Sequence, residues 1–302
     1  MFSIIVITYN RPEVALELLS NLNDLGAIDP LLTEVIVLDN ASTADYEAVK
    51  SFIEGPTSVP FHYIQSSENL GVSKGRNAAI RHAKAEYVFM IDDDAEFAEM
   101  PCLHYVASCF QQSFEQRAVG AVSVQVRYWE TGEIQRNLFP HKRFQERKDL
   151  DSFYTHYFAG AAHAIKRDVF LELGGFPADF FYGMEEYDLG YRLVKSGYCV
   201  VYCSRAVVLH KESPLGRVTP RSKHAMMWLN KVKVAWTYLP MRYYWSTVVM
   251  WSGAYFIQSK GDLFGWLKGL NRALAIRKHT SRQPLSQSDL TYLRRCEARL
   301  WY

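Results

Sequence analysis

The chain has 302 residues, of which 49% are hydrophobic and 22% are charged, and these proportions predict one large globular domain or a domain with an appendage. Its five cysteines are odd in number and include no Cys-x-x-Cys pair, which argues against a disulfide framework and favours buried, reduced thiols. The first residues, MFSIIVITYN, predict a strand rather than a secretory signal peptide. We therefore expect a cytoplasmic protein.

The formal net charge of +2 is distributed unevenly along the chain. Residues 213–302 contain 15 Lys and Arg against 3 Asp and Glu, whereas residues 1–212 contain 19 against 29. This asymmetry predicts an acidic catalytic body in residues 1–212 and a basic extension in residues 213–302. The acidic body argues against nucleic acid as a partner, although the extension is basic.

Strand-like and helix-like segments alternate through the first half of the chain. Residues 2–8 are almost all apolar, as expected for a strand that is covered on both faces. Pro12 marks the start of a helix. Strands are predicted at residues 34–40, 60–66 and 87–92, with a helix at residues 75–85. This order predicts an α/β fold with a single Rossmann-like, mostly parallel sheet flanked by helices.

The second half continues this pattern less regularly. Residues 118–126 predict a strand, followed by a hairpin that turns at Thr131-Gly132. Residues 157–176 predict a strand and a helix that stops at Gly174-Gly175. Residues 185–198 predict a helix that ends near Gly197, and residues 199–210 predict a pair of strands.

Three consecutive aspartates, Asp92, Asp93 and Asp94, end the predicted strand at residues 87–92. Polar residues end two other strands, at Thr8-Tyr9-Asn10 and at Asp39-Asn40. Open parallel sheets bind ligands at the carboxyl ends of their strands, so we expect these groups to converge on one cleft. A solvated acidic turn is the alternative, but a turn does not require three carboxylates.

Adjacent carboxylates repel one another, and burial raises their pKa values unless a cation compensates. Mg²⁺ and Mn²⁺ bind oxygen ligands, often one or two carboxylates together with phosphate oxygens of a substrate. Because Asp92 and Asp94 alternate along an extended segment, they can serve one ligand cluster. The spacing therefore predicts a site for a metal-bound nucleoside diphosphate.

Seven motifs occur in order along residues 2–212: SIIVITYNRP, VIVLDNAS, ENLGVSKGRNAAI, FMIDDDAEF, FAGAAHAIKRDVFLELGGF, FFYGMEEYDLGYRL and AVVLHK. Together they resemble the family-two inverting glycosyltransferases with the GT-A fold, and most nearly bacterial enzymes that add rhamnose or similar hexoses to surface polysaccharides. The resemblance implies a GT-A domain in residues 1–212 and a helical extension in residues 213–302.

The same resemblance implies a metal-dependent transfer of a hexose, with inversion, from a nucleoside-diphosphate sugar to a hydroxyl group. The donor would carry UDP, dTDP or GDP. The acceptor would be a saccharide or a lipid-linked saccharide in the synthesis of a cell-surface polysaccharide or glycolipid.

The resemblance assigns the base and ribose pocket of the donor to residues on the first two strands, namely Thr8, Tyr9, Asn10 and Asp39. Asp39 would accept a hydrogen bond from the base, or else cap a helix. Arg76 resembles the family's donor-site arginine, and Lys74 could reach a phosphate. Ordinary surface basic residues are the alternative for this pair.

By resemblance, Asp92-Asp93-Asp94 is the D-x-D motif of the family, in which Asp94 binds the metal directly. Asp92 would lie nearer the ribose as a second ligand, and Asp93 is assigned to the donor site. His210, at another strand end, would complete the metal coordination rather than serve only a structural role. An imidazole ligand suits Mn²⁺ better than Mg²⁺.

The acidic cluster MEEYDL supplies the candidates for the catalytic base, which takes the proton of the acceptor hydroxyl. The family usually has Glu-Asp here with the aspartate as base, and Glu186 occupies that position. Glu185 and Asp188 are the alternatives, and all three could simply be acids at a helix start. Beyond His210, Lys211, Arg217 and Arg221 could fold over the diphosphate or belong to a plain linker.

The extension contains an uncharged run at residues 243–259 that is too short for a good membrane span. A following helical stripe comprises Leu263, Trp266, Leu267, Leu270 and Leu274. Together with nearby Lys and Arg residues, this stripe predicts a helix that lies on an anionic membrane surface, at the inner face of the cytoplasmic membrane. A helical subdomain that packs on the core is the alternative.

Other enzyme classes fit less well. A dinucleotide-dependent oxidoreductase should show G-x-G-x-x-G after the first strand, where TYNRPEV contains no glycine. A sugar nucleotidyltransferase should show a glycine-rich basic loop at the same place. A glycosidase would not require a nucleotide pocket. A catalytically inactive relative that binds sugar nucleotides stays open as an alternative, although positions 94 and 186 are both acidic.

Overall fold

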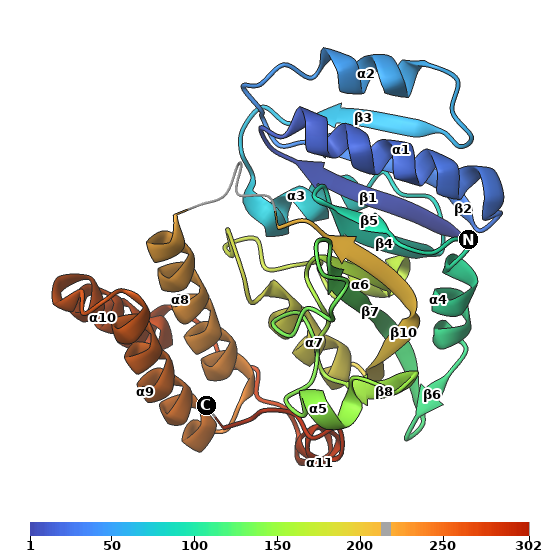
Figure 1. Cartoon of the computed structure of the whole chain (residues 1–302). Helices are drawn as coiled ribbons and strands as arrows, with labels where there is room; N and C mark the ends of the chain where they lie inside the picture. Colours follow the sequence, from blue (N-terminus) through green and yellow to red (C-terminus); the bar gives the residue numbers. More distant parts are fainter. Residues whose placement is uncertain (213–218, 302) are drawn as a thin grey trace.

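One mixed sheet forms the centre of the molecule in the computed structural model, which describes residues 1–212 and 219–301 (Figure 1). The strands are β1 (Phe2–Thr8), β2 (Leu32–Asp39), β3 (Phe61–Gln65), β4 (Tyr87–Asp92), β5 (Ala95–Phe97), β6 (Ser113–Phe114), β7 (Arg117–Tyr128), β8 (Ser152–Thr155), β9 (Ala162–Lys166) and β10 (Tyr198–His210). The helices of the first 212 residues are α1 (Pro12–Ile28), α2 (Glu47–Glu54), α3 (Gly71–Ile80), α4 (Leu103–Phe110), α5 (Phe144–Arg147), α6 (Arg167–Glu172) and α7 (Glu185–Lys195).

The order of the main strands is β3-β2-β1-β4-β9-β7-β10-β5. Parallel pairing joins β3, β2, β1 and β4, and also β7 and β10, whereas β9 and β5 run antiparallel to their neighbours. The expected α/β fold with a helical C-terminal region is thus confirmed, in the form of a mixed sheet. The carboxyl ends of β1, β2 and β4 lie at one edge, because these strands are parallel and in register.

Alternating side chains of β1 explain why helices cover both faces of the sheet. Ile4 and Val6 pack into the larger core cluster with the buried leucines of α1, whereas Ile5 packs into a second cluster with residues of α3, α6 and α7. All three side chains are at most 1% exposed. Complete burial of each such side chain stabilises the fold by about 1.5–3 kcal/mol. The apolar run at residues 2–8 therefore forms a strand with no solvent-facing side.

Three local predictions need correction. Residues 199–210 form one long strand, β10, because its pairing with β7 continues past an irregularity between Cys203 and Val207. The helix expected at residues 75–85 is α3, which starts earlier, at Gly71, and ends at Ile80. Helices α2 and α4 were not foreseen, since each is only eight residues long. All five cysteines are free and buried, as predicted.

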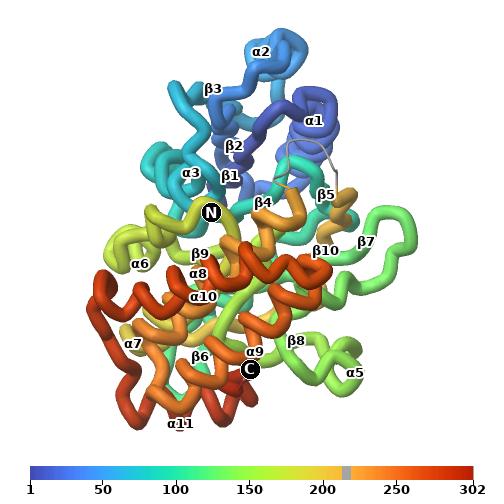
Figure 2. The backbone as a smooth tube through the Cα atoms, turned by 90° about the vertical axis from the view of Figure 1, so that its left-hand side faces the viewer, coloured from blue at the N-terminus to red at the C-terminus, as the bar shows by residue number. Residues whose placement is uncertain are grey.

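The C-terminal region consists of α8 (Pro220–Tyr238), α9 (Met241–Gln258), α10 (Leu263–His279) and α11 (Gln287–Arg295). Helices α8, α9 and α10 pack together beside the sheet domain, as both views show (Figures 1 and 2). Polar contacts tie this region to the body, since Tyr238 donates to Asp188 of α7 and Arg117 of β7 pairs with Asp289 of α11. None of the helices in the described part of the chain combines the length and hydropathy needed to cross a membrane.

Candidate active site

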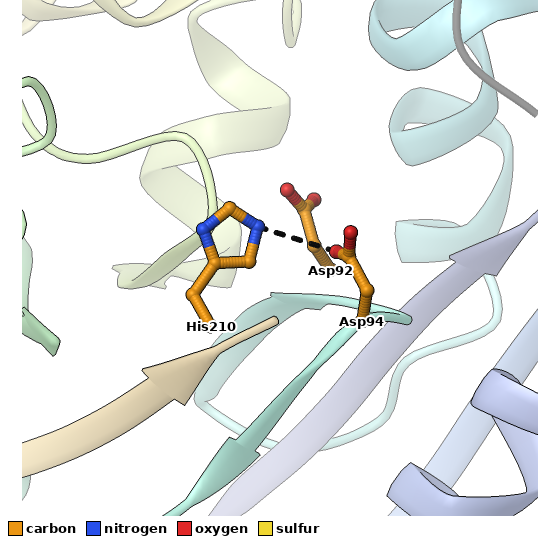
Figure 3. A group of neighbouring side chains, drawn as sticks. All are labelled: Asp92, Asp94 and His210. Atoms are coloured by element: carbon orange, nitrogen blue, oxygen red, sulfur yellow. Dashed lines mark ion pairs between the residues drawn. The ribbon is translucent and has the colours of Figure 1, made fainter. Parts of the chain in front are cut away.

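Asp92, Asp94 and His210 meet at the carboxyl ends of β4 and β10 (Figure 3). One ligand atom of each lies within 4.8 Å of the others, which is compatible with a shared metal ion. Asp94 and His210 are buried, whereas the side chain of Asp92 is 38% exposed. The sheet creates this cluster because β10 pairs antiparallel with β5, which places His210 opposite Ala95. Ala95 directly follows Asp94 in the sequence.

The hydrogen bonds of His210 fit a metal ligand. Its Nδ1 lies 3.0 Å from Oε1 of Gln135, so an N–H at Nδ1 can donate to Gln135 and leave the lone pair of Nε2 for a metal ion. Nε2 lies 3.3 Å from Oδ1 of Asp94. In this tautomer Nε2 and the Asp94 carboxylate can bind one cation together. The two carboxylates and the imidazole therefore form a donor set that suits Mn²⁺ or Mg²⁺.

Asp93 has a different environment from its neighbours. It is 1% exposed and forms an ion pair with Arg11, which also donates to Oδ2 of Asp94 at 3.0 Å. Burial raises the pKa of Asp93 to about 7, although the positive charge of Arg11 acts in the opposite direction. Asp93 and Arg11 therefore hold the aspartate turn in place next to the candidate metal ligands.

Arg76 links Asp92, at the end of β4, to Gly160, which lies just before β9. This side chain is 4% exposed, and its Nη2 lies 2.8 Å from Oδ1 of Asp92 and 2.8 Å from the carbonyl oxygen of Gly160. Lys74 lies two residues earlier on α3 and is exposed. Arg76 thus contacts Asp92, whereas the described contacts do not bring Lys74 to this cluster.

Glu186 in the first turn of α7 lies against Gly160. A Cβ atom at Gly160 would come within 2.2 Å of Oε1 of Glu186, so only glycine leaves room for this carboxyl group. Burial and the adjacent Glu185 raise the pKa of Glu186 to about 8. Glu185 is 2% exposed, and burial also raises its pKa. A carboxyl group with a raised pKa next to a metal cluster has the properties of a general base.

Asp188 points away from this cluster. Its Oδ1 accepts from Arg192 at 2.7 Å and 2.5 Å, and its Oδ2 accepts from Tyr238 of α8 at 2.9 Å. Both oxygens are therefore engaged, Oδ1 within α7 and Oδ2 in joining α7 to α8. The geometry favours Glu186 over Asp188 as the group that contacts an acceptor.

The side chains predicted for base and ribose form a connected group at the ends of β1 and β2. Asp39 is 1% exposed, and its carboxylate accepts from Tyr63 at 2.7 Å and from the backbone N–H of Ser42 at 2.8 Å. Thr8 shares a hydrogen bond of 2.6 Å with Tyr46. Asp39 therefore organises a turn rather than a helix start, because α2 begins only at Glu47.

Asn10 holds the neighbouring loop. Its backbone has a left-handed φ of 54°, and its Oδ1 accepts from the N–H groups of Thr43 and Ala44 at 2.7 Å and 3.0 Å. An asparagine tolerates this conformation better than most residues. Tyr9, the third residue of the predicted set, is half-buried beside it.

Several site residues were missed by the sequence reasoning. Tyr46, Tyr63, Gln135 and Gly160 contact predicted site residues but lie in segments with no polar motif at a strand end. Arg11 had a signal, since it directly follows Thr8-Tyr9-Asn10. The other four positions become visible only when the fold brings distant segments together.

The basic residues after β10 are only partly described. Lys211 lies 2.5 Å from Oε2 of Glu17 and 3.2 Å from Oε2 of Glu96, so two acids of the body hold it. Arg221, in α8, is paired with Asp262, the N-cap residue of α10. Arg217 lies outside the described residues. That this segment folds over the diphosphate of the donor stays a prediction.

Comparison with known proteins relates these features to a family. Residues 3–174 match the sequence model described as Glycosyl transferase family 2. A protein of unassigned function from Haemophilus influenzae is 28% identical over 181 residues, which are 59% of this chain and 93% of that protein. The N-acetylglucosaminyl-diphospho-decaprenol L-rhamnosyltransferase of Mycobacterium tuberculosis is 30% identical over 105 residues, so the match spans 33% of this chain and 34% of that enzyme.

Solved structures show the same architecture. The mannosyltransferase PcManGT from Pyrobaculum calidifontis, in complex with GDP-Man and Mn²⁺, has a TM-score of 0.56 and 21% identity, over 97% of this chain and 78% of that one. Residues 1–349 of S. aureus TarS, in complex with UDP-GlcNAc, have a TM-score of 0.63 and 16% identity, over 91% and 81% of the two chains. At these identities the likeness establishes the fold.

Proposed function

Because the chain belongs to glycosyl transferase family 2, and is therefore a glycosyltransferase, we propose that it transfers a hexose with inversion from a nucleoside-diphosphate sugar, with Mn²⁺ or Mg²⁺ as cofactor. The observation that carries the proposal is the link between the Asp92, Asp94 and His210 cluster and Glu186. Arg76 binds both Asp92 and the carbonyl of Gly160, and Gly160 lies against Glu186. One arginine thus fixes the distance between the metal ligands and the base.

The donor would lie across the ends of β1, β2 and β4. Thr8, Tyr9, Asn10 and Asp39 would form the base and ribose pocket, and Arg76 and Asp92 would border the diphosphate, with Lys74 at the entrance. Asp93, which is buried, would support the donor site from beneath through its ion pair with Arg11. Solved proteins of the same fold bind GDP-Man and UDP-GlcNAc, which supports UDP, GDP or dTDP as the carrier. Asp94, Asp92 and His210 would hold the metal, which stabilises the negative charge of the departing diphosphate.

Glu186 is assigned as the general base of a single displacement. The acceptor hydroxyl oxygen forms a bond to the anomeric carbon from the face opposite the diphosphate, and its proton moves to Glu186. The bond between the anomeric carbon and the phosphate oxygen breaks, and the electron pair leaves with the nucleoside diphosphate. No covalent enzyme intermediate is required. Glu185 remains the alternative base because it directly precedes Glu186 in α7 and the charge of Arg76 acts on both carboxyl groups.

The acceptor is assigned to saccharides carried on a membrane lipid, in the synthesis of a surface polysaccharide or glycolipid. The name of the Mycobacterium relative, which acts on a diphospho-decaprenol-linked sugar, supports this class. The exposed faces of α9 and α10 support it independently, since they carry large apolar side chains: Trp245, Val249, Met250, Phe256, Ile257, Leu263, Phe264 and Leu267. Exposed Lys260, Lys268 and Arg272 lie among them, and no Asp or Glu between 241 and 279 is exposed.

This surface revises the predicted stripe. Trp266, Leu270 and Leu274 pack against the core, so only Leu263 and Leu267 of that stripe face solvent. Apolar side chains ringed by cations, without exposed acids, fit the anionic inner face of a membrane. We therefore assign the protein to the inner face of the membrane, where it would bind peripherally.

Vesicle sedimentation tests the membrane assignment. Ile257→Ser/Phe264→Ser should reduce binding to phosphatidylglycerol vesicles by about tenfold or more, because two large apolar side chains no longer enter the lipid. Ile28→Ser, on the distant helix α1 and similarly exposed, is the control and should bind normally. If Ile257→Ser/Phe264→Ser bound the vesicles as tightly as wild type, this surface would not be the membrane-binding one.

Release of nucleoside diphosphate from UDP-, dTDP- and GDP-hexoses in the presence of Mn²⁺ tests the transferase assignment. Hydrolysis of the donor by water provides a basal rate without the acceptor, and added membrane lipid extract should increase it. Glu186→Gln should bind the nucleotide normally and lower turnover by about 10²–10⁴-fold, the usual contribution of a general base. Normal turnover by Glu186→Gln would move the base to Glu185.

A further inference from the structure

A cavity lies near the start of α7, which carries the proposed base. It has a volume of about 500 Å³, and its wall includes Tyr128, Arg136, Lys142, His156, Tyr187 and Arg299. Tyr187 directly follows Glu186, and Tyr128 is the register partner of His210 between β7 and β10. Two wall residues are therefore neighbours of the proposed base and of a proposed metal ligand, and none of the wall residues is assigned to the donor.

The wall of this cavity is positively charged. Arg136 and Lys142 come from the segment between β7 and α5, and Arg299 comes from the end of the chain after α11, and all three are exposed. Glu297 is the acid of the wall, and its carboxylate already pairs with Arg143 at 3.2 Å and Arg147 at 3.0 Å. Three cations from two distant segments thus face a shared space.

A fourth cation lies behind the wall. Lys231 of α8 is only 2% exposed, and its Nζ lies 3.3 Å from the centre of the Tyr187 ring. Burial lowers the pKa of Lys231, and the charge of Arg299 lowers it further. An anion in the cavity would stabilise the charged forms of both residues.

His156 adds a buried polar atom to the wall. Its side chain lines the cavity and is 3% exposed, and its Nε2 has no hydrogen-bond partner among residues 1–212 and 219–301. Buried polar atoms are nearly always hydrogen-bonded. Nε2 is itself closed to solvent, so a ligand would reach it only after the neighbouring side chains move.

The aromatic part of the wall is held in place by its own contacts. Tyr157 and Tyr187 stack with ring centroids 4.3 Å apart, and both line the cavity. Lys231 covers the other face of the Tyr187 ring. The two rings therefore form a fixed side of the cavity next to the cations.

We propose that this cavity binds the phosphoryl group of a phosphate-bearing acceptor and so directs the acceptor hydroxyl to Glu186. The assignment to an acceptor rests on the proposed transferase function. A phosphoryl group offers several acceptor oxygens and up to two negative charges, which matches the two guanidinium groups and the ammonium group of the wall. A carboxylate would leave part of this donor set without a partner.

Calorimetric titration with two probes, inorganic pyrophosphate and farnesyl diphosphate, tests the proposal. Both titrations contain EDTA, so that the metal site does not contribute. Wild type should bind the probes, and Lys142→Ala/Arg299→Ala should bind them at least about tenfold more weakly. Arg81→Ala/Lys84→Ala removes two exposed cations near the opposite end of β4 and should bind like wild type.

The outcomes separate the two proposals. Tighter binding of farnesyl diphosphate than of pyrophosphate would identify a lipid-linked source, and equal binding would identify the phosphoryl group alone as the recognised chemistry. No binding by wild type, or equal binding by Lys142→Ala/Arg299→Ala, would overturn the cavity assignment. UDP, dTDP and GDP with Mn²⁺ are titrated into the same variants, where normal nucleotide binding shows an intact fold. Failure of every nucleotide to bind wild type would instead overturn the transferase function.

Discussion

The metal cluster and the C-terminal helices place their charges in opposite ways. At the ends of β4 and β10, Asp93, Asp94 and His210 are buried, and each faces a charged or hydrogen-bonding partner. On α9 and α10 the cations face solvent and stand among exposed apolar side chains. Buried, converging groups select a small ion and a diphosphate, whereas a dispersed basic and apolar face suits a broad surface. One chain thus contains a site with fixed geometry and a surface that tolerates variation.

Removal of one proposed metal ligand, Asp94, should have the largest effect on activity. Asp94→Asn should lower turnover with Mn²⁺ by about 10³-fold, since the ion contributes several kcal/mol of charge stabilisation. Release of nucleoside diphosphate measures the loss. Asp24→Asn, an exposed aspartate of α1, is the control and should retain full activity. Normal turnover by Asp94→Asn would separate the acidic cluster from catalysis.

A smaller loss is expected when the base is displaced without being changed. Gly160→Ala places a methyl group against Oε1 of Glu186, and a displacement of about 1 Å costs roughly 10²-fold in rate. We expect kcat to fall while nucleotide affinity changes little. Gly253→Ala in α9, where a Cβ meets no atom within 4 Å, is the matched control. A fall in nucleotide affinity as large as the fall in kcat would show a general distortion instead.

The sheet and the metal cluster could be predicted because their signals are local. The apolar run at residues 2–8 and the aspartates after residues 87–92 each lie within a few residues, and parallel pairing brings such strand ends together. Gln135 and Gly160 could not be predicted, since their roles arise from contacts with residues far away in the sequence, His210 and Arg76. Helical spacing also failed to tell which apolar residues of α10 face the core, because that depends on α8 and α9.

The junction between the two regions provides the third test. Asp188 accepts from Arg192 within α7 and joins α7 to α8 through Tyr238, so Asp188→Asn should destabilise the fold by about 2 kcal/mol. Catalysis by the folded variant should remain within about threefold of wild type. Denaturation with urea, together with turnover at a temperature where the variant is folded, measures both. Loss of turnover with unchanged stability would make Asp188 the base.

The smallest expected effect concerns pH. Glu186 accepts a proton only when it is ionised, and its pKa is raised to about 8 by burial and by Glu185. Below that pH the ionised fraction falls about tenfold per pH unit, so kcat/KM should rise with pH and level off above about 8. The residual activity of Glu186→Gln should not show this rise of kcat/KM with pH. A wild-type profile that is flat between pH 6 and pH 9, a range that brackets the pKa of about 8, would argue against Glu186 as the base.

Calorimetric titration of UDP, dTDP and GDP, each with and without Mn²⁺, tests the central claim most directly, because it requires neither the acceptor nor the sugar. The account predicts that one diphosphate binds tightly in the presence of Mn²⁺, that its affinity falls sharply with EDTA, and that Asp94→Asn abolishes the dependence on metal. Equal affinity with and without Mn²⁺ would contradict the metal role of Asp92, Asp94 and His210. Failure of all three nucleotides to bind the folded protein would contradict the donor site itself.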